Sequence, residues 1–181
     1  MAAQVNEEKT FLLVTGASRG LGKAFSIALA GTLGQGSVIY LIARTENALI
    51  ETQNEILENN KALEVRYFLI DQANAEKQAY VDMLNRIDPK QFNSAIIIHN
   101  SGSIGKQGQM VCDYDDKEEL SSYYTLNVFS VMLLNSVFMK TFSSGKHQTI
   151  LKQSYQCYIN RTVKILRNML KENNNKHNLF F

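Results

Sequence analysis

The segment Thr10-Phe-Leu-Leu-Val-Thr-Gly-Ala-Ser-Arg-Gly-Leu-Gly22 decides the fold of this chain. Residues 10–15 form a short apolar run that is typical of a strand buried on both faces. Leu21, Phe25 and Leu29 then recur at helical spacing, which predicts an amphipathic helix directly after the turn. The glycines therefore lie between a buried strand and a helix N-terminus, where free backbone amides and the helix dipole favour a phosphate group.

Each glycine of this segment has its own expected task. Gly16 makes the tight turn, Gly20 lets the backbone approach the phosphates, and Gly22 lets helix and strand pack closely. A plain glycine-rich connection is the alternative, but strand, glycines and helix follow in the order that a dinucleotide site requires. The residues predicted to hold the dinucleotide here are Gly16, Ser18, Arg19, Gly20, Leu21 and Gly22.

Strand-like and helix-like segments alternate along the rest of the chain. Further strands are expected over 37–42, 64–70, 94–99 and about 148–151, and helices over 46–60, 75–87 and 118–142. This alternation is the pattern of a parallel sheet with helices on both faces. We therefore predict an α/β fold, a Rossmann-type doubly wound sheet in three layers, with strand order 3-2-1-4-5 and incomplete on its C-terminal side.

The composition of the chain bounds its class. With 181 residues, 45% apolar and 20% charged, it suits one globular domain. The net charge of +2 comes from interspersed charges, which gives no reason to expect nucleic acid as a partner. No signal peptide or membrane segment is evident, and the two cysteines lack the spacing of a disulfide framework or metal site. We expect a cytoplasmic protein without a membrane partner and without a metal.

The composition changes at about residue 152. Residues 1–151 are expected to form the nucleotide-binding domain, and 152–181 a divergent C-terminal helix and tail. Ile159, Val163 and Leu166 recur at helical spacing there, before an asparagine-rich end.

The choice of cofactor can be argued from charge. A site for NAD carries an acidic residue after the second strand to bind the ribose 2′-hydroxyl, whereas a 2′-phosphate needs a cation. This chain has Ala43 and Arg44 at that position, and Arg19 in the glycine turn. Arginine can grip a phosphate with two parallel hydrogen bonds, although both arginines could also be ordinary surface residues. NADP(H) is therefore the predicted cofactor.

Taken together, these motifs resemble the short-chain dehydrogenase/reductase family. The glycine spacing Gly-x-x-x-Gly-x-Gly after a threonine, Asp71 after the third strand, and His99-Asn100-Ser101-Gly102 after the fourth match its pattern. The resemblance implies that Asp71 lies near the adenine and that the loop from His99, with Asn100, Ser101 and Gly102, faces the cofactor. Together with the segment from Tyr123 to Met132, the motifs look most like the members that reduce a pterin.

The family's catalytic groups are matched only in part. Asn127 fits the asparagine of the proton path, and Ser154 lies where the carbonyl-binding serine is expected. The tyrosine that donates the proton and the lysine four residues later are absent, because counting reaches Arg167 and Lys171 and no Tyr-x-x-x-Lys occurs in the chain. Arginine cannot replace the tyrosine, since it holds its proton too firmly.

Two interpretations follow from the resemblance. One is an NADPH-dependent reductase that acts on a pterin carbonyl in tetrahydrobiopterin biosynthesis. The other is a truncated, catalytically inactive NADP-binding or dimer-modulating fragment. In the family the long helix, here 118–142, pairs across a dimer, and its apolar residues on more than one side suit a homodimer.

Overall fold

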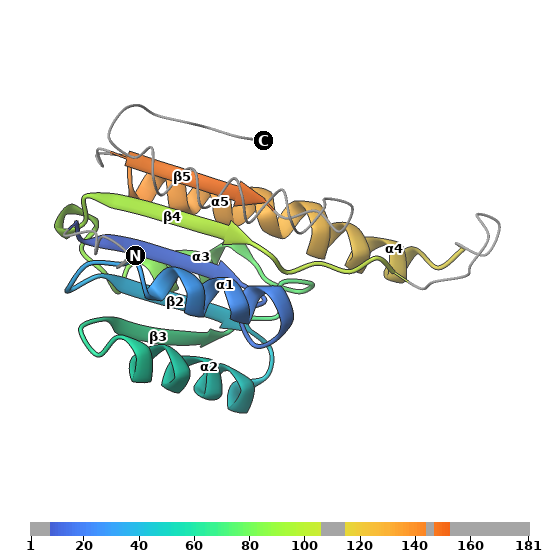
Figure 1. Ribbon diagram of the computed structural model, residues 1–181. Coiled ribbons are helices and arrows are strands. Elements are labelled where there is room, and N and C mark those ends of the chain that lie inside the picture. The colour runs from blue at the N-terminus through green and yellow to red at the C-terminus, as the bar shows by residue number, and fades with distance from the viewer. Residues whose placement is uncertain (1–7, 106–114, 144–146, 153–181) are drawn as a thin grey trace.

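Five parallel strands form one sheet in the computed structural model, which describes residues 8–105, 115–143 and 147–152 (Figure 1). The order is β3-β2-β1-β4-β5, as the sequence predicts, and every neighbouring pair is parallel. The strands are β1 (Thr10–Thr15), β2 (Val38–Ala43), β3 (Glu64–Leu69), β4 (Ser94–His99) and β5 (His147–Lys152). Lys152, the first residue of the predicted C-terminal segment, belongs to β5, and residues 153–181 lie outside the described residues.

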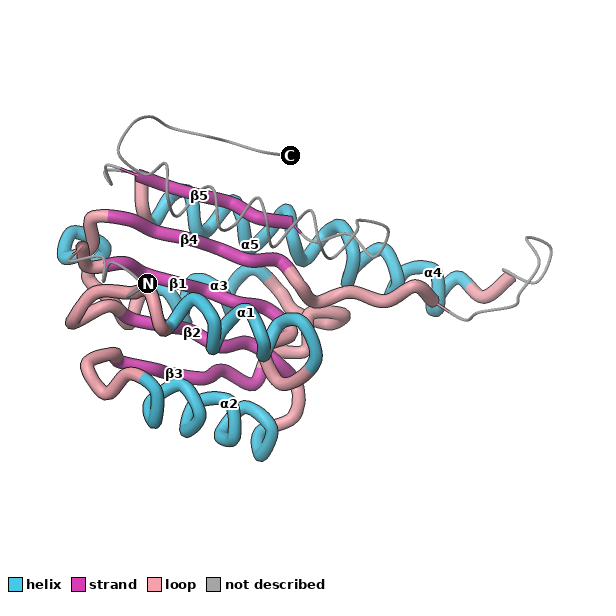
Figure 2. The backbone as a smooth tube through the Cα atoms, viewed as in Figure 1, coloured by secondary structure: helices cyan, strands magenta, loops and turns pink. Residues whose placement is uncertain are grey.

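Helices cover both faces of the sheet, which gives the predicted three layers (Figure 2). On one face lie α1 (Gly20–Ala30) and α2 (Glu46–Asn59), and on the other lie α3 (Lys77–Leu84) and α5 (Ser130–Thr141). The 3₁₀ turn η1 (Pro89–Gln91) leads into β4. No helix in the described ranges is long and apolar enough to cross a membrane.

The central strand β1 supplies side chains to both cores. Leu12 and Val14 pack towards α1 and α2, whereas Phe11 and Leu13 pack towards α3 and α5. All four side chains are fully buried. This alternation explains why the strand reads as a continuous apolar run rather than as alternating polar and apolar residues.

The helix expected over 118–142 is not continuous. It consists of α4 (Lys117–Tyr124), the π-helical turn η3 (Thr125–Phe129) and α5, and α4 projects beyond the carboxyl ends of the strands (Figure 1). The side-chain amide of Asn127 donates a hydrogen bond of 3.0 Å to the carbonyl oxygen of Tyr123. In a regular α-helix that oxygen would accept from the backbone amide of residue 127, so this side chain competes with the helical hydrogen bond.

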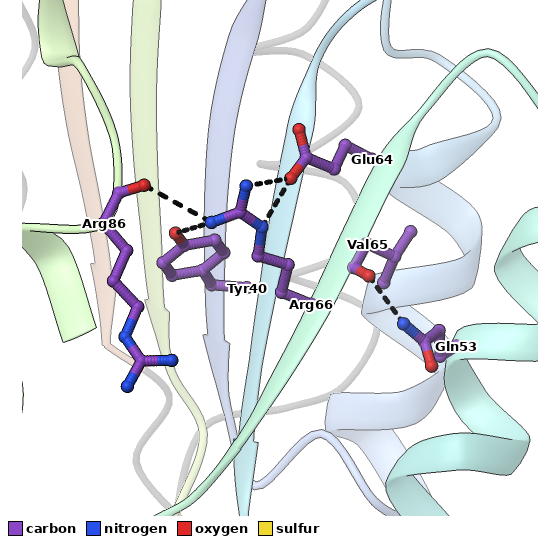
Figure 3. Close-up of polar contacts among 6 residues, drawn as sticks. All are labelled: Tyr40, Gln53, Glu64, Val65, Arg66 and Arg86. Carbon is purple, nitrogen blue, oxygen red and sulfur yellow. Dashed lines mark hydrogen bonds and ion pairs between the residues drawn. The ribbon is translucent and has the colours of Figure 1, made fainter.

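Arg66, on the edge strand β3, forms a group of polar contacts with Tyr40, Glu64 and Arg86 (Figure 3). Its guanidinium donates hydrogen bonds to the Tyr40 hydroxyl at 3.2 Å and to the Arg86 carbonyl at 3.3 Å, and it pairs with Glu64. Its central carbon also lies 5.9 Å from the centre of the Tyr40 ring. The Tyr40 hydroxyl, on a buried side chain, therefore accepts a hydrogen bond from a cation that also lies near its ring.

The outward edge of β3 is also partly occupied. The Glu64 amide donates to Ser37 and the Ile70 amide to Ala43, so the even-numbered residues of β3 direct their backbone groups to β2. Val65 directs its carbonyl outward, where it accepts a hydrogen bond of 2.6 Å from the Gln53 side chain of α2 (Figure 3).

Candidate cofactor site

The carboxyl ends of β1, β2 and β4, with the residues that follow β3, surround a cavity of about 710 Å³. The chain leaves β1 towards one face of the sheet and leaves β4 towards the other, which is where ligands bind in open α/β sheets. Of the residues predicted to hold or face the cofactor, all except Gly22 and His99 line the cavity: Gly16, Ser18, Arg19, Gly20, Leu21, Ala43, Arg44, Asp71, Asn100, Ser101 and Gly102.

Two glycines of the turn, Gly22 and Gly20, differ in the space around them. A Cβ atom on Gly22 would lie 2.2 Å from the Gly16 carbonyl oxygen, so this glycine permits the contact between α1 and the turn. Gly20 has a φ of +56°, and a Cβ atom there would meet nothing within 4 Å. Gly20 is thus required by its left-handed backbone, and it leaves open space in front of the first turn of α1.

The N-terminus of α1 opens onto this space. Arg19 is its N-cap residue, and no side chain caps the helix there. Gly20 and Leu21, in the first turn, both line the cavity. Amides in the first turn have no partner within the helix, so this end offers hydrogen-bond donors and the positive end of the helix dipole to an anion.

Two arginines border the same cavity. Arg19 and Arg44 are exposed, and neither forms a salt bridge among the residues that the structure describes. The first carboxylate after Arg44 is that of Glu46, which does not line the cavity and accepts a hydrogen bond of 3.0 Å from the Tyr67 hydroxyl. That hydrogen bond raises the pKa of the Tyr67 phenol. The two guanidinium groups therefore give this end of the cavity a positive charge that suits a phosphate.

Asn100 and Ser101 are fixed against the glycine turn. The backbone amides of both residues donate hydrogen bonds of 3.0 Å to the Thr15 hydroxyl, and the Asn100 side chain donates one of 3.2 Å to the Gly16 carbonyl. The ends of β1 and β4 are thereby joined beneath the cavity. Thr15 is fully buried, and the sequence marks it only as the strand residue and the threonine that precedes the glycine motif, not as an acceptor for the loop after β4.

Asp71 lines the cavity through a turn that it stabilises itself. One carboxylate oxygen accepts a hydrogen bond of 3.1 Å from the Ala73 amide, and the other accepts one of 2.9 Å from the Asn74 side chain. Its carboxylate is therefore held within the turn that follows β3, at the border of the cavity.

Several lining residues were not anticipated from the sequence. Thr45, Ile70 and Gln72 adjoin predicted site residues at the carboxyl ends of strands, so their position alone could have indicated them. Ala48 lies in the first turn of α2, and Leu126 comes from the π-helical turn. The five additional residues are Thr45, Ala48, Ile70, Gln72 and Leu126.

His99 does not take part in this cavity, although it was expected to face the cofactor with Asn100. Its side chain is buried, and Nε2 lies 2.7 Å from Oδ1 of Asn135 in α5. Alternation along β4 explains the difference, because a residue inside a strand points to the opposite face from its neighbours.

Asn127 fixes the loop after β4 instead of reaching into the cavity. Its side chain accepts a hydrogen bond of 3.1 Å from the Ser103 amide and donates one of 3.0 Å to the Ser103 carbonyl. Its neighbour Leu126 lines the cavity. The other catalytic candidate, Ser154, lies outside the described residues, as do Arg167 and Lys171.

Relatives of known identity share this sequence pattern. The family model described as short chain dehydrogenase matches residues 10–173. Sepiapterin reductase of Xenopus tropicalis is 32% identical over 143 residues, which cover 78% of this chain and 55% of the relative. The rat sepiapterin reductase is 28% identical over 149 residues, covering 80% and 57%. The chain thus spans little more than half the length of these curated relatives.

Solved structures share the fold. A short chain dehydrogenase of Shigella flexneri, complexed with NADP, superposes with a TM-score of 0.70 at 18% identity, covering 83% of this chain and 61% of that one. L-sorbose reductase of Gluconobacter frateurii, complexed with NADPH and L-sorbose, gives 0.67 at 20% identity, covering 82% and 53%. With the glycine turn and the parallel sheet in the expected places, the chain belongs to the short-chain dehydrogenase family.

Proposed function

We propose that this chain binds NADP(H) in the cavity at the carboxyl ends of the strands. The observation that carries the proposal is the pairing of an uncapped helix N-terminus with two arginines around one cavity, neither of which forms a salt bridge among the described residues. The amides of the first turn of α1 would bind the pyrophosphate. Arg19 and Arg44 would bind the 2′-phosphate, and the turn of Asp71 would face the adenine.

The reaction that fits this cofactor is NADPH-dependent reduction of a carbonyl, with a pterin as the substrate. The support is the similarity to sepiapterin reductases over most of this chain. NADPH, when bound, supplies the hydride for such a reduction. Of the catalytic candidates, Asn127 would hold the loop after β4 in place, and Ser154 would bind the carbonyl oxygen.

A second candidate function is cofactor binding without reduction. It is favoured by the sequence itself, in which no tyrosine is followed four residues later by a lysine. A phenol needs a nearby cation to donate a proton at neutral pH, because its unperturbed pKa is about 10. Such a chain would act by binding NADP(H) or by joining a subunit of a related reductase.

Two measurements on the same protein separate these functions. Quenching or energy transfer of NADPH fluorescence gives the affinity for the cofactor, and consumption of NADPH in the presence of sepiapterin gives the turnover. Binding together with turnover supports the reductase, and binding without turnover supports the second function. Absence of affinity for both NADPH and NADH would contradict both.

A homodimer through α5 is also proposed. Phe129 and Met132 expose 51% and 64% of their surfaces on the helical segment that was expected to pair. Exposed apolar side chains of this size, at the end of η3 and in the first turn of α5, suit a contact with a second copy of the chain.

A further inference from the structure

A buried hydroxyl joins α2 to the glycine turn. Thr52, in the middle of α2, is fully buried, and its hydroxyl lies 3.1 Å from the carbonyl oxygen of Ala17 and 2.9 Å from that of Ala48. The hydroxyl has one proton, which it shares between these two acceptors. One of the bonds stays within α2, whereas the other links residues that are 35 positions apart in the sequence.

The acceptor Ala17 is held from two sides. Its amide donates a hydrogen bond of 3.2 Å to the Ile42 carbonyl of β2, and its carbonyl accepts from Thr52. Ala17 is itself fully buried, while Ser18 and Arg19 follow directly and line the cavity. The position of Arg19 therefore depends on a residue that is anchored to β2 and to α2.

The same helix begins close to the second arginine. Arg44 follows β2 and lies two residues before the start of α2 at Glu46. Ala48, the other acceptor of Thr52, lines the cavity. One hydroxyl thus connects the backbone that carries Arg19 with the helix that begins beside Arg44.

Packing alone does not require a hydroxyl at this position. Leu49 and Ile56, the other buried residues of α2, are both apolar. Valine has nearly the shape of threonine and would fill the same space without a polar group to satisfy. An ion pair of 2.7 Å between Lys23 and Glu55 already holds α1 and α2 together nearby. We therefore attribute the hydroxyl to its hydrogen bond with the Ala17 carbonyl, which it holds in place.

We propose that Thr52 is a positioning residue for recognition of the 2′-phosphate of NADP(H), because it sets the distance between the backbones that carry Arg19 and Arg44. This inference rests on the proposed function. Two guanidinium groups can bind one phosphate only if both reach it together, so a shift of the turn weakens binding of the 2′-phosphate more than binding of the rest of the nucleotide.

The test uses two small probes that differ by the 2′-phosphate alone. The affinities of adenosine 2′,5′-bisphosphate and of adenosine 5′-monophosphate are measured by calorimetry for the wild type, Thr52→Val and Thr52→Ser. Thr52→Val is expected to lower the affinity for the bisphosphate by about tenfold and that for the monophosphate by less than about twofold. Thr52→Ser keeps the hydroxyl and is expected to retain the wild-type ratio of the two affinities.

Thr141→Val is the matched control. It removes a hydroxyl that donates 2.9 Å to the Val137 carbonyl in α5, and Thr141 does not line the cavity. Thermal unfolding of each variant shows whether it is folded at the assay temperature. Should Thr52→Val not fold, Thr52→Cys tests the same bond, since a thiol fills the space but donates only weakly.

The possible outcomes are distinct. If Thr52→Val has the wild-type ratio of the two affinities, whether or not both affinities fall, the role of Thr52 is overturned. The same holds if Thr52→Ser lowers the ratio as much as Thr52→Val does. Neither result contradicts the cofactor proposal. If the wild type binds neither probe, nor NADPH, the proposed function itself fails, and the role of Thr52 fails with it.

Discussion

The Thr15 hydroxyl accepts a hydrogen bond of 3.0 Å from the backbone amide of Asn100, which joins the ends of two adjacent strands beneath the cavity. The Ser101 amide donates to the same oxygen. One side chain therefore satisfies two backbone donors in a loop that borders the proposed cofactor.

Thr15→Val is expected to lower the free energy of unfolding by about 1–3 kcal/mol, because it leaves these two amides without an acceptor in a largely buried place. Urea unfolding measures the change. Thr15→Ser retains the acceptor and should lose much less. Equal stability of the valine variant and the wild type would show that water replaces the hydroxyl.

Substitutions at Gly22 and Gly20 should differ in their effects on stability and on cofactor binding. Gly22→Ala places a Cβ atom 2.2 Å from the Gly16 carbonyl, so we expect a loss of about 3 kcal/mol or more in the free energy of unfolding. Gly20→Ala meets no atom within 4 Å and costs only the left-handed conformation, roughly 1–2 kcal/mol.

The same pair separates folding from binding. Gly20→Ala should remain folded and yet lose most of its affinity for NADPH, since its methyl group occupies the space proposed for the phosphates. Thermal unfolding and NADPH fluorescence, measured on both variants, check this. A folded Gly20→Ala protein with unchanged affinity would place the phosphates elsewhere.

Arg44→Asp should reverse the cofactor preference. It replaces a cation with an acid at the end of β2, which disfavours a 2′-phosphate and favours a ribose hydroxyl. The ratio of the NADPH and NADH affinities should fall by at least about tenfold. Lys61→Asp makes the same change of charge before the amino end of β3, away from the cavity, and should leave the ratio unchanged.

Alkaline pH should destabilise the fold through Tyr40. Burial raises the pKa of its phenol above the usual 10.0. Above that value the unfolded chain releases the proton while the folded chain retains it, so stability falls as the pH rises from about 10 towards the folded pKa. Tyr40→Phe should show a smaller fall in the free energy of unfolding between about pH 8 and about pH 11. An identical fall in both proteins would assign the alkaline sensitivity to other groups.

Met132→Glu should shift a dimer towards the monomer, because it places a charge on the exposed apolar surface of α5. Sedimentation velocity at several protein concentrations measures the shift. Ala28→Glu, at an exposed position of α1 on the opposite face of the sheet, is the control and should not change the association.

The sequence predicts the sheet well because its strands are bounded by clear signals. The predicted strands over 10–15 and 94–99 have the same bounds as β1 and β4, since apolar runs end there at glycine, asparagine or another polar residue. The long helix is harder to predict, because periodicity cannot reveal that the Asn127 side chain donates to the Tyr123 carbonyl, which a regular α-helix would pair with a backbone amide.

Within the candidate site, residues adjacent to the motifs were predictable and those brought in by packing were not. Leu126 reaches the cavity from the π-helical turn η3, which joins α4 beyond the strand ends to α5 on the face of the sheet. The positions of Arg19 and Arg44 at one cavity follow from β1 and β2 being neighbours, which the strand order predicted. Their roles as phosphate ligands remain predictions.

The hydrogen bond from Gln53 to the Val65 carbonyl hinders association of the protein with itself at high concentration. A strand from a second molecule that tried to extend the sheet beside β3 would have to displace this amide and approach the charged pair of Arg66 and Glu64. An exposed strand edge is where intermolecular β-pairing and aggregation begin. Gln53 therefore protects the edge of β3 from pairing with a second molecule. Replacing it with alanine is expected to lower the solubility of the protein.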